Sequence, residues 1–337
     1  MYQFFGKTIL VTGGTGSIGS EIVRQLLKYE PKAIRIYSRG EEKQFYMQQE
    51  LSNHTNLRFL IGDIRDSQRI DYACRDVDII FHAAAMKHVP ASEYNPMEAV
   101  KTNVMGTQNV IDAAIKNNVK HFVGISTDKV VSPTNTMGAT KLLSEKLIIA
   151  ANQYKGKTET IFSCVRFGNV MGSSGSVIPL FSKQIKNNKD ITLTDVDMTR
   201  FMMSIPDAAR LVLSAAMNSK FGETYVLKMP AINILTLAQS LIKIYNDTHD
   251  EKYRGEIKVV GIRPGEKLYE ELMTTDEIER SYENDKMYII PPHYHATDEL
   301  YKDYEKIKIT AYSSDATELM SGQEFIRIAK ENNVVTW

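Results

Sequence analysis

Two neighbouring residues, Asp128 and Lys129, carry side chains that can exchange protons, and Thr127 precedes them with a hydroxyl group. A carboxyl group and an amine held together can serve as a proton donor and a proton acceptor in the same reaction. As a base, Lys129 needs a depressed pKa, and we expect burial and nearby cations such as Lys141 to depress it. On the pair alone, the simpler interpretation is an exposed turn in which the two charges pair locally.

A second candidate site is the glycine-rich turn near the start of the sequence. The apolar run 8–11 leads into glycines with the spacing G-x-x-G-x-x-G, and a helix-like segment follows at 20–27. Glycine lets the backbone approach a ligand closely, and the N–H groups at a helix N-terminus attract a pyrophosphate. A strand, a turn and a helix in this order predict a dinucleotide site; a tight turn without a ligand is the alternative. The expected contacts are Gly13, Thr15, Gly16, Ser17, Ile18 and Gly19.

The end of the second strand should select the type of dinucleotide. A carboxylate there binds the ribose 2′-hydroxyl group of NAD, whereas a cation accepts the 2′-phosphate of NADP. The sequence offers Ser38, Arg39 and Lys43 but no acid at the strand tip. Since arginine binds phosphate through two parallel hydrogen bonds, we predict NADP rather than NAD; a solvated loop is the alternative. The next two strands should end at further cofactor contacts: Asp63, Ile64, Ala83, Ala84 and Ala85.

A regular alternation of strands and helices positions these residues. We predict strands at 9–12, 33–38, 57–62, 78–84, 121–127 and 160–166, with amphipathic helices that include 42–51 and 96–117. Several strands are nearly continuous apolar runs, which is typical of parallel sheets covered on both faces. The pattern predicts an α/β fold with a doubly wound parallel sheet of the Rossmann type. We expect residues 1–170 to form the NADP-binding domain, with some later segments returning to it, and residues 171–337 to form mainly a smaller C-terminal substrate-binding domain and a tail.

The composition is that of an ordinary globular protein. The 337 residues include 41 Lys plus Arg and 41 Asp plus Glu, so no net charge argues for nucleic acid or an anionic membrane as a partner. The two cysteines, Cys74 and Cys164, lie in apolar surroundings, and we find neither a signal peptide nor a membrane-spanning run, so we expect a cytoplasmic protein. His293 and His295 alternate like metal ligands but lack cysteines or clustered carboxylates nearby, and we therefore expect no metal site.

Several motifs carry a family resemblance. The opening glycines, GDIRD (62–66), HAAA (82–85), NVMGT (103–107) and STDK (126–129) resemble the extended short-chain dehydrogenase/reductases. Within that superfamily, AMKHVP (85–90), RFGNV (166–170), GSVIPLF (175–181), DMTRF (197–201) and RPGEK (263–267) are similar to the soluble bacterial UDP-N-acetylglucosamine 4,6-dehydratases of capsule and flagellin-sugar pathways. The resemblance covers about residues 4–275.

The resemblance implies an NADP-dependent lyase that recycles its cofactor. The C4 hydroxyl group of UDP-N-acetylglucosamine is oxidised, water leaves across C5 and C6, and hydride returns to C6. The product is a UDP-4-keto-6-deoxy-N-acetylhexosamine, and we expect inversion at C5. The family roles of acid at the C6 hydroxyl group and base at C5 pass to Asp128 and Lys129, respectively. The resemblance also implies a role in polysaccharide biosynthesis and a homo-oligomer, such as a hexamer.

One position departs from the Tyr-x-x-x-Lys pattern of the superfamily. The segment here reads MGATK, with Met137 in the tyrosine position and Lys141 on the same helical face, within reach of the nicotinamide ribose. Methionine cannot exchange a proton, although some of the resembled dehydratases share it. The base for the C4 hydroxyl group must then be Thr127, Lys129, Lys141 or a water molecule held among them.

The UDP group needs cations and backbone donors, and arginine meets this need because it binds phosphate through two hydrogen bonds. The resemblance also adds Asn103 to the cofactor contacts. An ordinary surface lysine is the alternative for Lys87, and Glu266 can instead anchor Arg263. The expected substrate contacts are Lys87, Asn169, Val177, Ile178, Pro179, Arg200, Arg263 and Glu266.

Two other functions fit parts of the sequence. A UDP-N-acetylhexosamine 4-epimerase shares the oxidation at C4 but returns hydride to C4, so it needs no acid–base pair for C5 and C6. A non-catalytic NADP-binding scaffold is supported by Met137 alone, and the retention of Lys129 and Lys141 argues against it. The pair formed by Asp128 and Lys129 favours the dehydratase.

Overall fold

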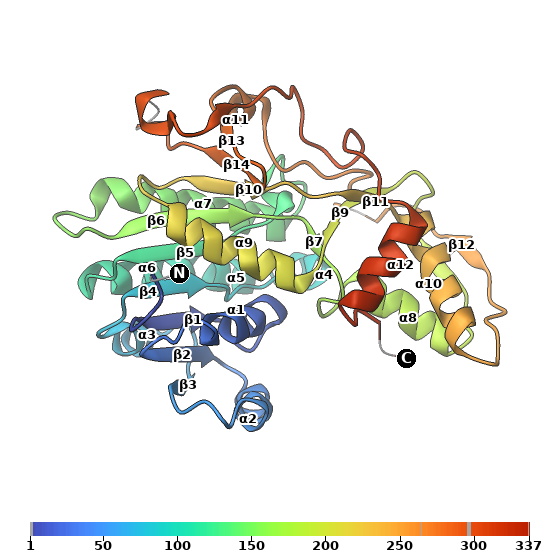
Figure 1. Cartoon of the computed structure of the whole chain (residues 1–337), viewed down its shortest axis with the longest axis horizontal. Helices are drawn as coiled ribbons and strands as arrows, with labels where there is room; N and C mark the ends of the chain where they lie inside the picture. Colours follow the sequence, from blue (N-terminus) through green and yellow to red (C-terminus); the bar gives the residue numbers. More distant parts are fainter. Residues whose placement is uncertain (1–2, 264, 295–297, 336) are drawn as a thin grey trace.

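The structure, a computed structural model, describes residues 3–263, 265–294, 298–335 and 337; Pro264 of the RPGEK motif and His295 lie outside the described residues. Among these residues, ten strands form one sheet in the order β15-β13-β14-β10-β6-β5-β4-β1-β2-β3 (Figure 1). The neighbouring strands β10, β6, β5, β4, β1, β2 and β3 run parallel to one another. The strands β14, β13 and β15 are antiparallel to their neighbours. The prediction of a doubly wound parallel sheet is confirmed.

The six predicted strands all form, within two residues of their expected bounds. They are β1 (Thr8–Thr12), β2 (Ala33–Ser38), β3 (Leu57–Ile61), β4 (Ile79–His82), β5 (His121–Ile125) and β6 (Ile161–Arg166). The other strands of the sheet are β10 (Thr224–Leu227), β13 (Tyr282–Glu283), β14 (Met287–Ile290) and β15 (Glu305–Lys306). Side chains alternate between the two faces, so that Ile9 and Val11 pack into one buried cluster and Leu10 packs into another.

Helices cover both faces of this sheet (Figure 1). The helical segments of this part of the fold are, in chain order, α1 (Ser17–Leu27), α2 (Glu41–Glu50), α3 (Ser67–Cys74), α4 (Val89–Tyr94), α5 (Pro96–Ala99), η1 (Val100–Gly106), α6 (Thr107–Lys116), η2 (Asp128–Val130), α7 (Thr136–Tyr154), α9 (Ile205–Asn218), α11 (Thr275–Glu279) and η3 (Asp298–Tyr301). Helix α9 returns from the second half of the chain to pack beside α1, where Gln25 Nε2 donates to Pro206 O at 2.8 Å.

The segment 96–117, expected to be a single helix, is continuous but changes its hydrogen-bond pattern. Between α5 and α6, η1 is a π-helix, a form that is rare and often marks functional sites. The wider turn buries Thr102 and Asn103, two polar residues, against the rest of the fold. This places an amide side chain close to the loop that follows β4.

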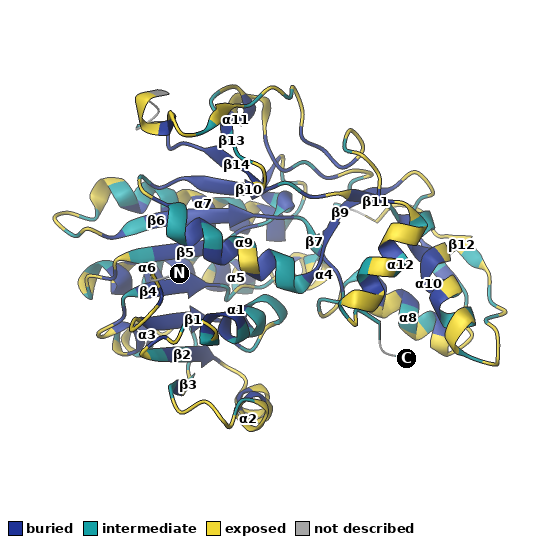
Figure 2. Cartoon of the chain, in the orientation of Figure 1, coloured by how far each residue is buried: buried dark blue, intermediate teal, exposed yellow. Residues whose placement is uncertain are grey.

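The remaining elements form a smaller lobe with its own core, at the right of Figure 1. The buried side chains of this core include Phe181, Leu193, Leu237 and Phe325. In Figure 2 its helices bury the faces that point toward one another and expose their outer faces. The elements are β7 (Asn169–Val170), α8 (Val177–Lys186), β8 (Ile191–Leu193), β9 (Thr199–Met203), β11 (Ala231–Asn233), α10 (Ile234–Thr248), β12 (Ile257–Val259) and α12 (Gly322–Glu331).

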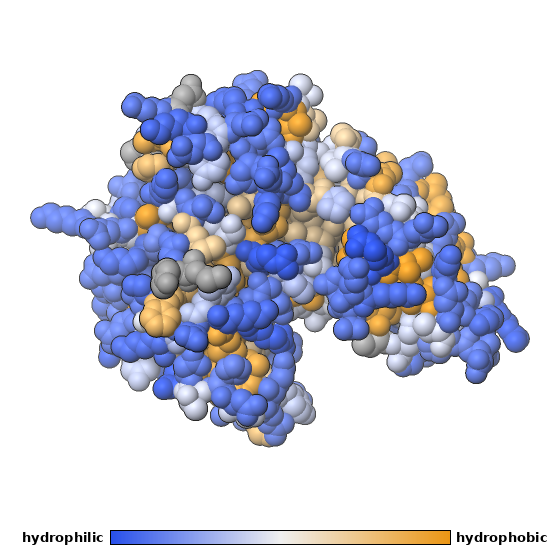
Figure 3. Space-filling view, viewed as in Figure 1, coloured by the Kyte–Doolittle hydropathy of each residue, from blue (hydrophilic) through white to orange (hydrophobic). Residues whose placement is uncertain are grey.

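The surface is mainly hydrophilic on the face drawn in Figure 3, with small apolar patches scattered over it. Cys74 and Cys164 are buried and unbonded to each other. None of the described helices combines the length and the apolar character that crossing a membrane requires.

Candidate active site

The glycine turn joins β1 to α1, and its shape excludes side chains. Gly13 has a φ angle of +67°, and a Cβ atom there would lie 2.7 Å from Ala84 N. A Cβ atom on Gly19 would overlap the carbonyl oxygen of Gly13. Gly16, at the N-cap of α1, has no side chain to cap the first N–H groups of the helix. The turn therefore has the open backbone and uncapped helix N-terminus that a pyrophosphate requires.

The other predicted residues of this turn face different neighbours. Thr15 Oγ1 donates to Ser38 Oγ at 3.0 Å, which ties the turn to the end of β2. Ser17 Oγ accepts a hydrogen bond from Ser174 N at 3.4 Å, so the loop before α8 reaches the cofactor turn. Ile18 is half-buried and packs against the main core.

The end of β2 brings Arg39 and Asp63 together. Arg39 is exposed, and its Nη1 atom lies 3.7 Å from Asp63 Oδ2. Burial works to raise the pKa of Asp63, but hydrogen bonds from Arg65 and the charge of Arg39 leave this pKa below its ordinary value. Ser38 is buried at the same place, and Lys43 exposes its side chain on α2. A cation and an anion thus stand together at the end of β2, where the sequence predicts the cofactor ribose.

Two predicted cofactor contacts have their side chains engaged elsewhere. Ile64 is buried, and its side chain packs where a Cβ atom on Gly106 would lie, so only its backbone is available to a cofactor. Asn103 accepts a hydrogen bond from Met86 N at 2.8 Å and donates to Met86 O and Thr140 Oγ1, both at 3.0 Å. Asn103 therefore holds the loop after β4.

The predicted small residues at the end of β4 leave the backbone at this edge of the sheet uncovered by side chains. Ala84 N lies 3.4 Å from Thr12 Oγ1, its acceptor, and Ala83 N donates to Thr12 O at 3.1 Å. Ala85 is exposed at the start of the loop. The absence of larger side chains at these three positions leaves the backbone next to Gly13 accessible.

A cavity of about 1080 Å³ is lined by residues from both parts of the fold. Asn169 Oδ1 and Ser176 Oγ, in two of the lining residues, are buried without a hydrogen-bond partner among the described residues. Buried polar atoms normally have partners, so these two atoms are available to a polar ligand in the cavity. The predicted site residues that line the cavity are Lys129, Asn169, Val177, Pro179, Arg200, Arg263 and Glu266.

Arg200, on β9, is held mostly by the chain itself. Its guanidinium group donates to the carbonyl oxygens of residues 199, 267 and 268 at 2.7–3.0 Å. Glu266 Oε1 lies 3.9 Å from Arg200 Nη2, and Glu266 Oε2 accepts from Arg263 N at 3.4 Å. Arg200 and Glu266 thus anchor the segment 263–268, whereas the side chain of Arg263 is exposed at the cavity.

Two predicted substrate residues have side chains that do not line the cavity. The side chain of Ile178 is 1% exposed and lies in the core of the smaller lobe, so only the backbone of Ile178 is available to a substrate. Its neighbours Val177 and Pro179 line the cavity. Lys87 has an exposed side chain outside the lining; partial desolvation and the nearby Lys129 cation lower the pKa of its amine.

Thr127, Asp128 and Lys129 form a short hydrogen-bonded chain after β5. Asp128 Oδ1 accepts from Thr127 Oγ1 at 2.6 Å and from Lys129 Nζ at 2.9 Å. Asp128 is fully buried, and its Oδ2 atom has no hydrogen-bond partner among the described residues. The alternative of an exposed turn is therefore excluded for Asp128.

The expected depression of the Lys129 pKa is wrong. Burial alone would lower this pKa, but the carboxylates of Asp128 and Glu270 outweigh burial and raise it. The cation that opposes them is Arg200 rather than Lys141. The pKa of Lys141 is lowered, by contrast, because burial outweighs the charges around it.

Met137 and Lys141 share a buried face of α7, as predicted. Met137 is 3% exposed. Lys141 Nζ donates to Ile125 O at 2.6 Å, at the carboxyl end of β5. Because β1 and β5 run in the same direction, Lys141 Nζ lies at the same edge of the sheet as the glycine turn after β1.

Sequence reasoning missed Glu270, which lies three residues beyond the RPGEK motif. Its Oε1 atom is 3.7 Å from Lys129 Nζ and 3.8 Å from Arg200 Nε. Burial raises the pKa of Glu270, and the Asp128 carboxylate adds to this effect. Its burial depends on a distant segment, since Glu270 N donates to Ser314 Oγ at 3.0 Å.

A buried ionic cluster around Arg166 was also missed. Arg166 Nε donates to Glu145 Oε2 at 2.9 Å, and Arg166 Nη1 donates to Glu277 Oε2 at 2.8 Å. Burial would raise the pKa of Glu277, but Arg166 lowers it to about 2. The cluster ties the end of β6 to α7 and α11, and so it fixes the strand beside β5.

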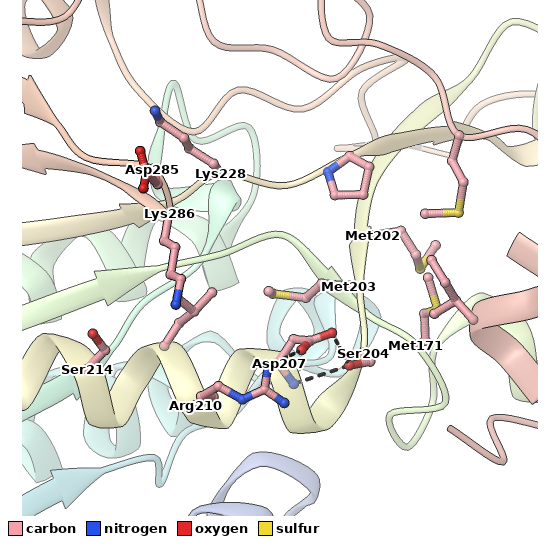
Figure 4. Close-up of a pocket in the computed structure, with 14 residues that line it drawn as sticks. Met171, Met202, Met203, Ser204, Asp207, Arg210, Ser214, Lys228, Asp285 and Lys286 are labelled. Atoms are coloured by element: carbon pink, nitrogen blue, oxygen red, sulfur yellow. Dashed lines mark hydrogen bonds and ion pairs between the residues drawn. The ribbon is translucent and has the colours of Figure 1, made fainter. Parts of the chain in front are cut away.

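A second cavity, of about 330 Å³, lies apart from these residues (Figure 4). Met171, Met202 and Met203 line one side of it, and Arg210 pairs with Asp207 at 2.9 Å on the other. The described residues that line it include none of the predicted site residues. Seven of the predicted site residues, Lys129 among them, line the larger cavity instead.

Both the sequence and the fold are similar to those of known proteins. The family described as "Polysaccharide biosynthesis protein" matches residues 9–292. A Campylobacter jejuni protein named UDP-N-acetylglucosamine 4,6-dehydratase (inverting) is 47% identical over 292 residues, which are 86% of this chain and 84% of that protein. A Rickettsia rickettsii protein named UDP-glucose 4-epimerase is 45% identical over 293 residues, with the same two coverages. The X-ray structure of Pen from Bacillus thuringiensis is 45% identical with a TM-score of 0.93, over 99% of this chain and 100% of that one.

Proposed function

Since the chain belongs to the polysaccharide biosynthesis protein family, we propose that it is an inverting UDP-N-acetylglucosamine 4,6-dehydratase. The observation that carries this proposal is the chain of Thr127, Asp128 and Lys129, which places acid–base groups beside a cavity of the size that small-molecule ligands occupy. The Campylobacter jejuni relative with this name supports the choice of substrate.

We assign NADP to the glycine turn between β1 and α1. Close backbone contact at Gly13 and Gly19 supports a pyrophosphate there, and the exposed Arg39 supports a 2′-phosphate at the end of β2. Lys141 is assigned to the nicotinamide ribose. When bound, NADP supplies the oxidation at C4 of the sugar and the later reduction at C6.

The side chains of this protein then handle the protons. In the active form Asp128 is a carboxylate and Lys129 a free amine. Asp128 receives the proton of the C4 hydroxyl group through Thr127 Oγ1, and Lys129 Nζ takes the proton from C5. Asp128 passes its proton to the C6 oxygen, which leaves as water, and Lys129 returns a proton to C5. Each side chain ends in its starting form.

Thr127 is our choice among the groups that can replace the missing tyrosine. Its hydroxyl group is 2.6 Å from Asp128 and can pass a proton along this hydrogen bond. Lys141 Nζ is instead directed to Ile125 O at 2.6 Å. Met137 has no exchangeable proton.

The test is mass spectrometry of UDP-N-acetylglucosamine after incubation with the protein and NADP in heavy water. The proposal expects loss of one water and gain of deuterium at C5, and it expects both to disappear in Lys129→Ala. An unchanged mass with a new sugar isomer would establish the epimerase instead. No change of any kind, in the wild type or in Lys129→Ala, would leave a binding scaffold.

The epimerase stays as a second candidate because the Rickettsia rickettsii relative with that name is nearly as similar as the dehydratase. The buried Asp128 argues against it, since epimerisation at C4 needs no acid for a leaving C6 hydroxyl group.

We further propose the setting in which the enzyme works. The main sheet with residues 1–170 and the returning elements α9, β10 and β14 forms the NADP-binding domain, and the smaller lobe binds the substrate. The protein acts in the cytoplasm as a homo-oligomer, such as a hexamer, and makes a precursor of a capsule-type polysaccharide.

A further inference from the structure

We propose that Glu270 is a positioning residue for Lys129: as a second carboxylate beside Asp128, it holds the amine at the cavity and sets the pH range in which this amine becomes a base. The inference rests on the proposed function, because Lys129 is the base of that reaction.

The geometry places one amine between two buried carboxyl groups. Lys129 Nζ lies 2.9 Å from Asp128 Oδ1 and 3.7 Å from Glu270 Oε1. The side chain of Glu270 is 6% exposed, and both Lys129 and Glu270 line the cavity. A group so poorly hydrated interacts strongly with a charge at this distance. Glu270 is thus in a position to act on substrate chemistry through Lys129.

The surroundings keep Glu270 in place. Its backbone N donates to Ser314 Oγ at 3.0 Å, and its Oε1 atom lies 3.8 Å from Arg200 Nε. Arg200 also binds the carbonyl oxygens of residues 267 and 268, just before Glu270 in the chain. The segment that carries Glu270 is therefore anchored to β9 independently of Lys129.

The charged groups around the pair determine the direction of the effect. Asp128, Glu270 and Arg200 act on Lys129, and the charge of Lys129 in turn reaches Lys87. The charged groups that shift the pKa of Glu270 are Lys129, Asp128, Arg200 and Lys267. The Glu270 carboxylate stabilises the ammonium form of Lys129, so removing its charge must favour the free amine.

The first experiment measures the protonation of Lys129 without relying on turnover. The full-length protein is labelled with acetic anhydride over a pH series, and acetylation of the Lys129 peptide is followed by mass spectrometry. In Glu270→Gln the midpoint of reactivity should move to lower pH by about one unit, so that Lys129 reacts about tenfold faster below the wild-type midpoint. An unchanged or higher midpoint overturns the proposal.

A matched variant controls for changes around Arg200. Glu266→Gln removes a carboxylate 3.9 Å from Arg200 Nη2, and Glu270→Gln removes one 3.8 Å from Arg200 Nε. Glu266, however, is not among the groups that shift the pKa of Lys129. Its Lys129 midpoint should stay at the wild-type value. An equal shift in both variants would assign the effect to Arg200 and overturn the role of Glu270.

Turnover and a conservative variant complete the test. The acid limb of the kcat profile should move to lower pH with the labelling midpoint, whereas a purely structural role would reduce kcat at every pH without moving the limb. If Glu270→Gln does not fold, Glu270→Asp provides the test, because it moves the carboxylate away from Lys129 by one methylene group. The Lys129 labelling midpoint should then move to lower pH by a smaller amount. An unchanged midpoint in Glu270→Asp refutes the proposal. A wild type that does not dehydrate UDP-N-acetylglucosamine refutes the proposed function, while the labelling still tests Glu270.

Discussion

Replacing Gly13 by alanine separates the cost of an unfavourable backbone angle from the cost of steric contact at the cofactor turn. Gly13 has a φ angle of +67°, and Gly6 has a nearly equal φ angle of +66°. A Cβ atom on Gly13 would meet backbone atoms of Ala83 and Ala84 at 2.7–2.8 Å, whereas one on Gly6 would have nothing within 4 Å. Gly6→Ala is therefore a matched control for Gly13→Ala.

The losses in the free energy of unfolding should differ between the two variants by the cost of the steric contact at Gly13. A positive φ angle costs an alanine about 1–2 kcal/mol in either position. At Gly13 the shortfall from an ordinary 3.4 Å contact is about 0.7 Å, and since backbone atoms cannot rotate away, the overpacking adds about 1–3 kcal/mol. The same displacement moves the N–H groups at the start of α1, so we expect NADP affinity to fall at least about tenfold, or 1.4 kcal/mol.

Urea unfolding and isothermal titration with NADP measure both quantities. Gly6→Ala should lose about 1–2 kcal/mol of stability and bind NADP like the wild type. Gly13→Ala should lose more stability and bind NADP more weakly. Wild-type affinity in Gly13→Ala, or an equal loss of affinity in Gly6→Ala, would refute the placement of NADP at this turn.

Three further outcomes test the packing around the site. Glu277 has a pKa of about 2 in the fold against 4.5 when unperturbed, so its ionised form stabilises the protein above about pH 4.5 and this contribution is lost as the pH falls toward 2. Urea unfolding of Glu277→Gln at pH 7 should show a loss of about 3 kcal/mol, and the wild type should lose a similar amount on acidification that the variant does not; equal acid sensitivity in both would contradict this. Met137→Tyr should fold at a cost of about 1–3 kcal/mol, because the site is buried, and still bind NADP in a thermal-shift assay; complete loss of binding would contradict the position of this helix face. Tyr312→Phe should lose about 1–3 kcal/mol in urea unfolding, because Tyr312 OH accepts from Met229 N at 2.7 Å and donates to Leu227 O at 2.9 Å inside the core; wild-type stability would show that these bonds contribute nothing.

Local patterns sufficed to predict the strands β1 to β6 and the glycine turn that follows β1. The strands of the parallel sheet are apolar runs separated by short amphipathic segments, and the glycines follow the first of them directly. In each case the residues that determine the structure are neighbours in the sequence. The hydroxyl, carboxyl and amine of residues 127–129 are also contiguous, but the pair alone favoured an exposed turn, and the family resemblance supplied the acid and base roles.

Long-range packing explains what the sequence did not reveal. The pKa of Lys129 is raised partly by Glu270, which is 141 positions away in the chain and is buried with the help of Ser314. Ile178 stands between two cavity residues, yet its side chain belongs to the core of the smaller lobe. Charges and burial of this kind depend on which segments meet, and spacing along the chain does not contain that information.

The number of residues in the π-helix η1 determines where Asn103 lies relative to the loop after β4. A π turn holds more residues than an α turn, so deleting one residue from 100–106 would restore α-helical pairing and remove the wider turn that buries Thr102 and Asn103. Asn103 would then no longer meet both Met86 N and Met86 O, and the loop between β4 and α4 would lose its clamp.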